Sequence, residues 1–316
     1  MQQFAWQELW PEGTSSVEWS HSGIAVLGNE DVVFAAPGGG ALVIVDPVTG
    51  ATREVAVPLL EIHGISRVER AGREVLLLAD PGSKARPESG YDYNVGRAPG
   101  QVLLFDLADG SHQTIAPPPH PAYADATWCP TSAVADGDGT IWVADGYGAS
   151  LVHAYAADGT YLRTLGGEAS GTAFSCPHGV VIDSRGREQR LVVADRGNRR
   201  LVVFTLDGEF VEVIDSPLFT SPSSLAVHGE SIVITELFGG LLEWNHAGVA
   251  PLTHPTAPAA RELPWPNALN ADGAQVRPAL EHGVLNSPHG VAVGTDGSIY
   301  LTEWLIGGRQ WRLTPA

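Results

Sequence analysis

A short phrase limits the folds open to this chain: three times, an isoleucine or proline is followed by a histidine, a glycine and an apolar residue. The three copies are Ile62-His63-Gly64-Ile65, Pro177-His178-Gly179-Val180 and Pro288-His289-Gly290-Val291. Successive histidines lie roughly 110 residues apart, about twice the ~45–50 residues of one propeller-type repeat. The phrase therefore marks alternate units of a repeat, and a closed ring of such units would bring the three imidazoles together on its axis.

The unit that begins with the second copy has the pattern of a four-stranded meander. Its short apolar runs are rich in β-branched residues, are bounded by Gly, Asp or Asn, and cover 175–183, 191–195, 201–204 and 210–213. The preceding unit, 129–162, has the same pattern, with Thr131 at the position of His178. We therefore expect strands in both units, with a histidine at this template position in only one of them.

Four further units fit the same template, at 22–57, 62–115, 223–252 and 288–313. The last unit ends after three strands, whereas the segment 3–9 has no unit of its own. We expect this segment to supply the missing outer strand, because closing the ring removes exposed sheet edges. Six units lie within the ~4–8 blades of known propellers. The sequence thus predicts an all-β, six-bladed β-propeller as a single domain over 1–316, closed by an N-terminal outer strand in the last blade.

Charge narrows the range of partners. The chain has 18 Lys+Arg against 36 Asp+Glu, a formal net charge of −18, and this field would repel nucleic-acid phosphates and an anionic bilayer. We expect a monomer that acts on a small molecule, with no nucleic-acid or membrane partner.

The first residues lack the basic region and following apolar stretch of a signal peptide, and no run approaches the ~18 apolar residues of a membrane span. We therefore expect a cytoplasmic location. In that compartment we expect Cys129 and Cys176, which lie before a proline in neighbouring units, to be thiols.

Two long insertions interrupt the repeat, at 81–100 and 251–286. The first falls between the second and third strands of its unit and is rich in Gly, Pro and cationic or aromatic residues. Long loops on a regular scaffold are often lids or walls of a binding site, although solvated loops without such a role are nearly as common. Both interpretations remain open for each insertion.

Three histidines on a common axis suit a metal ion. Neutral imidazole binds Zn²⁺ and related ions, and three protein ligands with one open position are typical of a catalytic zinc site. In the alternative interpretation, each imidazole only donates a hydrogen bond to a backbone carbonyl at the start of a strand. The occurrence of His63, His178 and His289 in alternate units, with Ser22, Thr131 and Ser223 between them, favours the metal.

The loops after the second strands resemble those of NHL-repeat propellers. The relevant segments are Val193-Ala194-Asp195-Arg196-Gly197-Asn198-Arg199-Arg200-Leu201 and Val143-Ala144-Asp145-Gly146-Tyr147-Gly148. Within that group the pattern is most similar to the peptidyl-α-hydroxyglycine α-amidating lyases, zinc-dependent six-bladed enzymes that split a C-terminal α-hydroxyglycine into an amide and glyoxylate. The specific part of the resemblance is limited to the three histidine phrases and these two loops.

This resemblance implies roles for five residues. It places zinc on His63, His178 and His289, a general base at Tyr147 and a carboxylate-binding guanidinium at Arg196. In the alternative interpretation both residues have only structural roles: Tyr147 caps a loop, and Arg196 pairs with an acid of a neighbouring blade.

The sequence also departs from that family. An essential arginine of the family in the first unit is replaced here by Gly38-Gly39-Gly40, and the insertion at 81–100 offers substitutes for substrate binding in Arg86, Arg97 and Tyr91. The calcium-binding aspartate of the family is replaced by Gly290, so we expect no calcium. The secreted setting and disulfides of the family are absent, which favours a smaller hydroxylated carboxylate as substrate.

Carboxylates recur where the second strands end. In five units this position holds Asp80, Asp145, Asp195, Glu236 and Glu303. We expect them to bind loop amides rather than substrate. The leading hypothesis is a zinc-dependent lyase-like enzyme, with a binding scaffold, or a metal-dependent hydrolase or isomerase at the same site, as alternatives.

Overall fold

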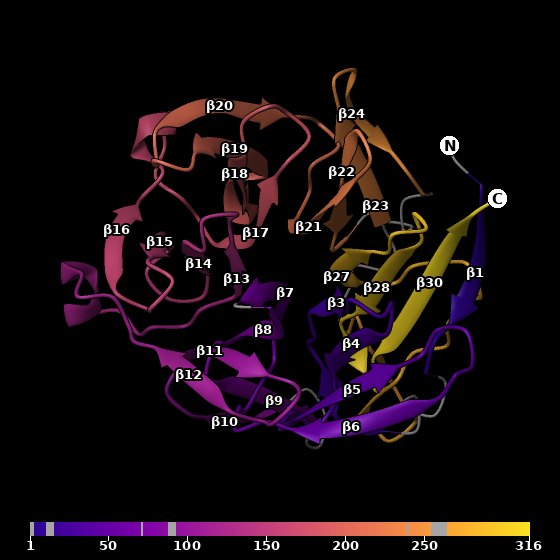
Figure 1. Ribbon diagram of the computed structural model, residues 1–316. Coiled ribbons are helices and arrows are strands. Elements are labelled where there is room, and N and C mark those ends of the chain that lie inside the picture. Colours follow the sequence, from indigo (N-terminus) through magenta and orange to yellow (C-terminus); the bar gives the residue numbers. More distant parts are fainter. Residues whose placement is uncertain (1–2, 11–15, 71, 88–92, 239, 254–263) are drawn as a thin grey trace.

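The computed structural model describes residues 3–10, 16–70, 72–87, 93–238, 240–253 and 264–316, and the side chains of 86–95 lie outside this description. Six four-stranded antiparallel sheets stand around a central axis (Figure 1). The predicted six-bladed β-propeller is therefore confirmed.

The blades follow one another along the chain. Blade 1 contains β3 (Ile24–Val26), β4 (Val32–Ala35), β5 (Ala41–Val45) and β6 (Thr52–Ala56). Blade 2 contains β7 (Gly64–Arg70), β8 (Arg73–Asp80), β11 (Gln101–Asp106) and β12 (His112–Ile115). Blade 3 contains β13 (Ser132–Ala135), β14 (Ile141–Asp145), β15 (Leu151–Tyr155) and β16 (Tyr161–Leu165). Blade 4 contains β17 (Pro177–Asp183), β18 (Arg190–Asp195), β19 (Arg200–Thr205) and β20 (Phe210–Asp215). Blade 5 contains β21 (Pro222–His228), β22 (Ser231–Glu236), β23 (Gly240–Asn245) and β24 (Gly248–Pro251).

The last blade joins the two ends of the chain. It contains β27 (Pro288–Val293), β28 (Ile299–Glu303), β30 (Arg309–Pro315) and, as the outer strand, β1 (Phe4–Glu8). β1 pairs antiparallel with β30, from Phe4 opposite Pro315 to Glu8 opposite Trp311. The expected closure by the N-terminal segment is thus confirmed.

The hydrophobic core lies between neighbouring blades. Leu42 and Ile44 of β5, for example, pack with Leu76 and Leu78 of β8 in one buried cluster. Middle strands are buried on both faces, whereas outer strands such as β6 are mostly exposed. This difference explains why the middle strands read as unbroken apolar runs.

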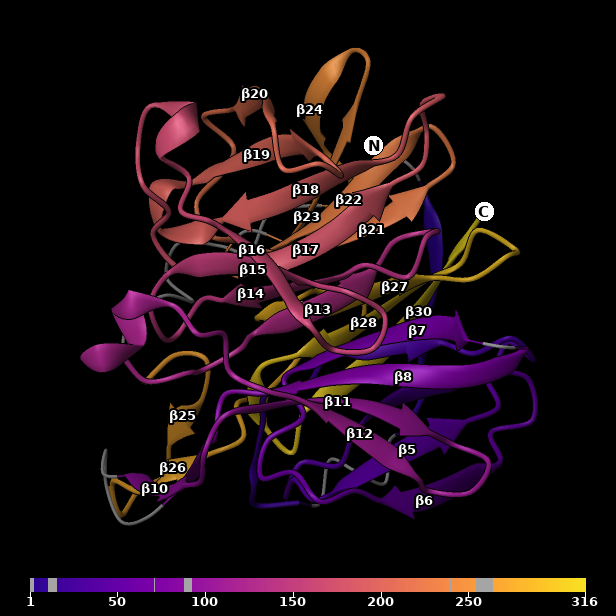
Figure 2. The same cartoon turned by 60° about the vertical axis from the view of Figure 1, so that its left-hand side comes forward.

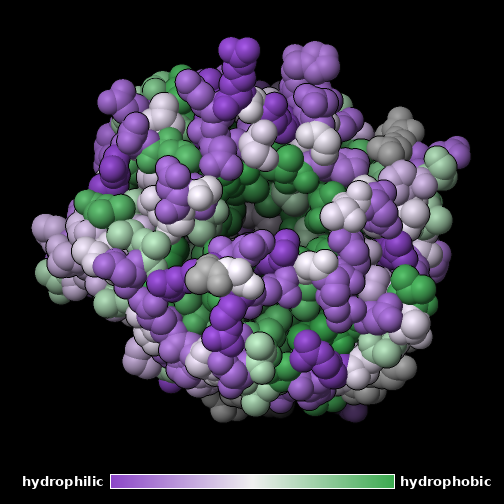
Figure 3. Space-filling view, in the orientation of Figure 1, coloured by the Kyte–Doolittle hydropathy of each residue, from purple (hydrophilic) through white to green (hydrophobic). Residues whose placement is uncertain are grey.

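A channel runs along the inner strands. Its volume is about 600 Å³, its walls include Ile65, Val180 and Leu225, and it extends to His63 and His178. Figure 3 shows apolar residues around the hollow at the centre of the face that Figure 1 presents.

Three small sheets lie outside the blades. They are β2 (Trp19–Ser20) with β29 (Leu305–Ile306), β9 (Ser83–Pro87) with β10 (Tyr93–Arg97), and β25 (Ala268–Leu269) with β26 (Gln275–Val276). Figure 2 shows β10, β25 and β26 at the face opposite to the one seen in Figure 1. Both predicted insertions, at 81–100 and 251–286, therefore contribute to the same face in their described parts.

Short 3₁₀ turns complete the described chain: η2 (Pro121–Ala124), η3 (Glu168–Ser170) and η4 (Arg196–Asn198). The described residues contain no helix with the length and apolar character needed to cross a membrane.

Candidate metal centre

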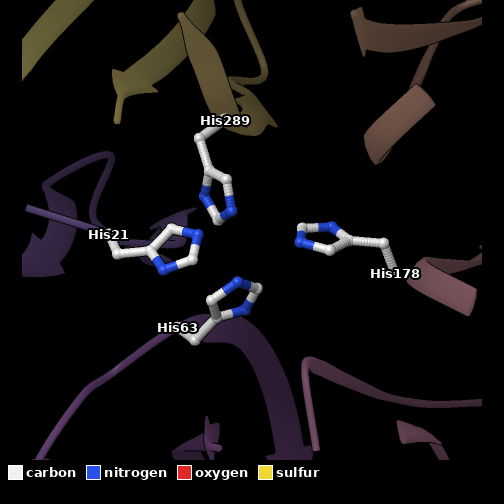
Figure 4. Close-up of side chains that lie close together, drawn as sticks. All are labelled: His21, His63, His178 and His289. Carbon is white, nitrogen blue, oxygen red and sulfur yellow. The ribbon is translucent and has the colours of Figure 1, made fainter. Parts of the chain in front are cut away.

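The three predicted histidines converge on the propeller axis (Figure 4). His63 precedes β7, whereas His178 and His289 lie at the starts of β17 and β27. Their ring centroids are 4.6–5.1 Å apart. The repeat therefore brings together residues that are far apart in the sequence.

Each of these histidines bonds to the backbone of the next blade. The Nδ1 atoms of His63, His178 and His289 lie 2.7, 3.0 and 3.0 Å from the carbonyl oxygens of Thr131, Ser223 and Ser22, respectively. A carbonyl oxygen only accepts, so each Nδ1 carries the proton and each Nε2 presents a lone pair to the axis. Such a bond to the second ring nitrogen is the usual support of a metal-ligating histidine. The backbone-bonded and metal-binding interpretations are thus compatible.

A fourth histidine, which the sequence analysis missed, completes the cluster. His21 lies between β2 and β3, and its ring centroid is 4.3 Å from that of His63 and 4.5 Å from that of His289. The ligand atoms of the four histidines all lie within 4.8 Å of one another. His21 could have been found from the phrase His21-Ser22-Gly23-Ile24, which places the histidine one residue earlier than in the template.

The Tyr147 hydroxyl lies among these nitrogens. It is 3.2 Å from Nε2 of His63, 3.1 Å from Nε2 of His178 and 3.4 Å from Nε2 of His21. One hydroxyl proton can serve only one of these acceptors at a time. The buried Nε2 atom of His289 has no hydrogen-bond partner within the described part of the chain. The cluster therefore has more lone pairs than protons, which a bound cation would correct.

Arg196 approaches the same group from blade 4. Its guanidinium lies 5.3 Å from the centroid of the Tyr147 ring, and its Nη2 donates to Cys176 Sγ at 3.1 Å. Among the described residues Arg196 makes no ion pair with an acid. The alternative that it pairs with an acid of a neighbouring blade therefore finds no support there. A half-buried cation without a carboxylate partner in the described chain suits an anionic ligand.

Burial controls ionisation at this site. It lowers the pKa of His21, His63 and His178 well below the ordinary value, and it lowers the pKa of His289 to about 4. The imidazoles are therefore neutral at pH 7, as metal ligands must be. Burial also raises the pKa of Tyr147, and the opposing effect of Arg196 does not outweigh it. The protein groups alone thus keep the phenol protonated.

The donor set fits a transition metal. Four imidazole nitrogens without a carboxylate in the cluster suit zinc, copper, nickel or iron, whereas calcium and magnesium prefer oxygen ligands. The residues present therefore fit the metal class that the sequence indicated, and they do not favour calcium.

The carboxylates at the ends of the second strands bind loop amides, as predicted. Asp80 accepts from the backbone of Leu60 and Gly82, and Asp145 accepts from Cys129 and Ala149. Equivalent bonds are made by Asp195 with Ser175, Glu236 with Thr220 and Ser221, and Glu303 with Ser287. These acids shape the loops that carry Tyr147 and Arg196.

The insertion at 81–100 contributes a residue that was not assigned a role. Lys84 is fully buried; its Nζ donates to the carbonyl of Trp19 at 2.6 Å and lies 2.9 Å from a carboxylate oxygen of the buried Glu61. Trp19 and Glu61 each stand two residues before a histidine of the cluster. Lys84 therefore ties the hairpin to the segments that carry His21 and His63.

The predicted substrate-binding residues of this insertion have different outcomes. Arg97 lies at the end of β10, and no hydrogen bond joins it to the four histidines within the described residues. Tyr91 and the side chain of Arg86 lie outside the described residues. Cys129 and Cys176 are free thiols, as expected.

Comparison with known proteins supports the fold. No protein-family model matches the chain. A streptogramin B lyase structure is similar at a TM-score of 0.62 and 16% identity, with 99% of this chain and 98% of that one covered. A luciferin-regenerating enzyme matches at a TM-score of 0.58 and 13% identity, over 98% of this chain and 95% of that one. A putative gluconolactonase matches at a TM-score of 0.56 and 13% identity, over 99% and 92%.

These identities are low, so the likeness shows the six-bladed propeller and no more. These comparisons do not show the similarity to NHL repeats or to the amidating lyases, which stays a prediction.

Proposed function

We propose that this protein is a metal-dependent lyase-like enzyme whose metal is zinc. The observation that carries the proposal is the set of three axial histidines whose Nδ1 protons are held by backbone carbonyls, so that three Nε2 lone pairs face one point. A scaffold propeller does not need several neutral imidazoles buried on its axis. The enzyme names of the similar structures agree with this proposal, although they describe those proteins.

His63, His178 and His289 would hold the ion, because they are the histidines with a backbone partner on the second nitrogen. His21 makes no hydrogen bond to a backbone carbonyl within the described part of the chain and lies against His63 and His289, so it would stand beside the position left open for a substrate oxygen. A bound zinc ion would act as a Lewis acid toward a substrate oxygen. Side chains of the protein would bind the substrate and transfer its protons.

Arg196 would bind the substrate carboxylate, because its guanidinium has no acidic partner in the described chain. Tyr147 would act beside the substrate hydroxyl, where its oxygen already lies 3.1 Å from a histidine nitrogen. The positive charge of a bound zinc ion, added to that of Arg196, would favour the phenolate of Tyr147. In the proposed reaction this phenolate takes the hydroxyl proton and the oxygen forms a carbonyl. The carbon–nitrogen bond breaks with its electron pair leaving on nitrogen, which then gains a proton. A hydroxyglycine-type substrate would give an amide and glyoxylate.

The alternative is a hydrolase or isomerase at the same site. The similarity to the structure of a putative gluconolactonase is the observation that favours this alternative. The two proposals differ in their products. A lyase releases an aldehyde acid without consuming water, whereas a lactonase opens an ester ring and releases a proton.

Metal content tests the proposal first. The purified chain, His178→Ala and the exposed-site control His246→Ala would be loaded with zinc, dialysed and analysed. We expect about one zinc per chain in the wild type and control, and loss in His178→Ala. The loaded protein would then be assayed for glyoxylate from hydroxyglycine derivatives, with Tyr147→Phe expected to lose at least about 100-fold in rate. Absence of zinc binding would remove the enzyme proposal.

A further inference from the structure

The same loop position surrounds the histidines in four blades. One or two residues after the carboxylate that ends the second strand, blades 3 to 6 carry Tyr147, Arg196, Phe238 and Trp304. Blades 3 and 4 thus carry a hydroxyl and a cation at this position, whereas blades 5 and 6 carry aromatic rings, of which Trp304 lies against His21. The site has two chemically different sides.

The aromatic rings form a continuous wall that begins at the cluster. Trp304 lies 5.5 Å from the His21 ring and stacks on Trp19 at 5.1 Å. Trp265, from the 251–286 insertion, meets Trp304 edge-on at 5.9 Å, and Phe238 lies 4.9 Å from Trp265. We call Phe238, Trp265 and Trp304 the aromatic wall.

These rings are built in place but are not core residues. All three are half-buried, and none belongs to the apolar clusters that fill the spaces between the described blades. Trp265 donates its indole N–H to the carbonyl of Asn286 at 3.3 Å, and the Trp304 backbone N–H donates to the carbonyl of Ser287 at 2.9 Å. The wall therefore keeps partly open apolar faces beside a polar centre.

The wall and the cation lie on different sides of the cluster. Trp304 contacts His21, whereas Arg196 contacts Cys176 and the Tyr147 ring next to His178. Figure 4 shows His21 and His178 at opposite ends of the histidine group. A ligand with its carboxylate at Arg196 and its reacting atom at the histidines would extend its remaining part toward the wall.

We propose that the substrate is a hydroxylated carboxylate that also carries an aromatic ring, and that Phe238, Trp265 and Trp304 bind this ring. The inference rests on the proposed function for the position of the reacting hydroxyl. Aromatic rings gain from edge and offset contacts with one another in addition to apolar burial. Hydroxy acids without an aromatic ring would be bound through their carboxylate at Arg196 and would gain nothing from the aromatic wall.

Paired ligands test the proposal by calorimetry, without turnover. Phenyllactate and lactate share the hydroxyl and carboxylate and differ by one phenyl ring. We expect the zinc-loaded chain to bind phenyllactate at least about 10-fold more tightly than lactate. Trp304→Ala or Trp265→Ala should reduce this ratio by roughly 5- to 10-fold at unchanged lactate affinity, whereas Trp304→Phe should retain most of it.

Two further variants separate the causes. Arg196→Gln should weaken both ligands by the same factor, and Trp244→Ala, near the end of β23 in blade 5 and beside Arg185, should change neither. Equal binding of the two ligands by the wild type, or equal loss of both in folded Trp304→Ala, would overturn the inference. Repeating the titrations without zinc distinguishes this result from failure of the lyase proposal, because a ring preference that persists without metal supports the wall alone.

Discussion

The imidazole of His178 and the carbonyl of Ser223 are joined by a 3.0 Å hydrogen bond, and a Cβ on Gly179 would lie 2.3 Å from that same oxygen. One backbone carbonyl thus requires a glycine and orients the histidine before it. Gly64 faces the carbonyl of Thr131 in the same way, at 2.6 Å. The repeated His-Gly phrase therefore has a packing cause as well as a chemical one.

Gly179→Ala should consequently destabilise the fold. The added methyl group cannot avoid backbone atoms of the next blade, so we expect a loss of at least about 1–3 kcal/mol in the free energy of unfolding, measured in urea. Gly186→Ala is the matched control, because its nearest contact would be an ordinary 3.6 Å. Equal stability of Gly179→Ala and the wild type would contradict the close approach described here.

The four histidines should differ in their effect on metal binding. Replacing His289 by Ala removes a nitrogen whose orientation is held by the Ser22 carbonyl, and we expect zinc to be lost. His21→Ala removes the one histidine of the four that makes no hydrogen bond to a backbone carbonyl among the described residues, so we expect one zinc per chain to remain with weaker affinity. Competition with a chromophoric chelator measures both. Loss of zinc in His21→Ala with retention in His289→Ala would reverse the assignment.

The buried pair of Lys84 and Glu61 should be important for stability. Lys84→Met leaves a buried carboxylate without its ammonium partner, and we expect a loss of about 3–5 kcal/mol by chemical denaturation. Adding Glu61→Gln should recover part of this loss. The exposed Arg67–Glu74 pair provides the comparison, since Arg67→Met should cost about 0–1 kcal/mol. Similar losses for the two single variants would show that burial of the first pair has no energetic consequence.

Acid should also destabilise the protein through a buried histidine outside the axial cluster, in blade 3. His153 is buried, bonds to the Tyr123 hydroxyl at 2.8 Å and to Thr164 Oγ1 at 2.8 Å, and burial lowers its pKa to about 3. Between pH 6.5 and 3 the unfolded chain binds a proton that the folded chain does not, so stability falls as pH decreases through this window.

The contribution of His153 can be isolated by comparison. The four axial histidines act in the same direction in metal-free protein, so the wild type must be compared with His153→Gln. We expect the variant to lose less stability between pH 6.5 and 5, by up to about 2 kcal/mol. His246→Gln, at an exposed turn, should follow the wild type. Parallel pH curves for wild type and His153→Gln would refute this role.

Repeat spacing was sufficient to predict the ring, its closure by the segment 3–9 and the convergence of His63, His178 and His289. These features follow from recurring patterns, because a middle strand buried on both faces must be apolar and a backbone carbonyl of the next blade excludes a Cβ after His63 and His178. The loop carboxylates were predictable for the same reason.

Side chains that lie outside the repeated pattern could not be predicted from the sequence. His21 stands one residue away from the template position, and Lys84 and Trp265 come from insertions that have no repeat to compare. The sequence by itself determined the scaffold and three of the axial histidines, because periodic burial and backbone packing are local to each blade. Only the tertiary structure placed His21 beside His63 and Trp265 against Trp304, because those contacts depend on how separate blades and insertions meet at one face.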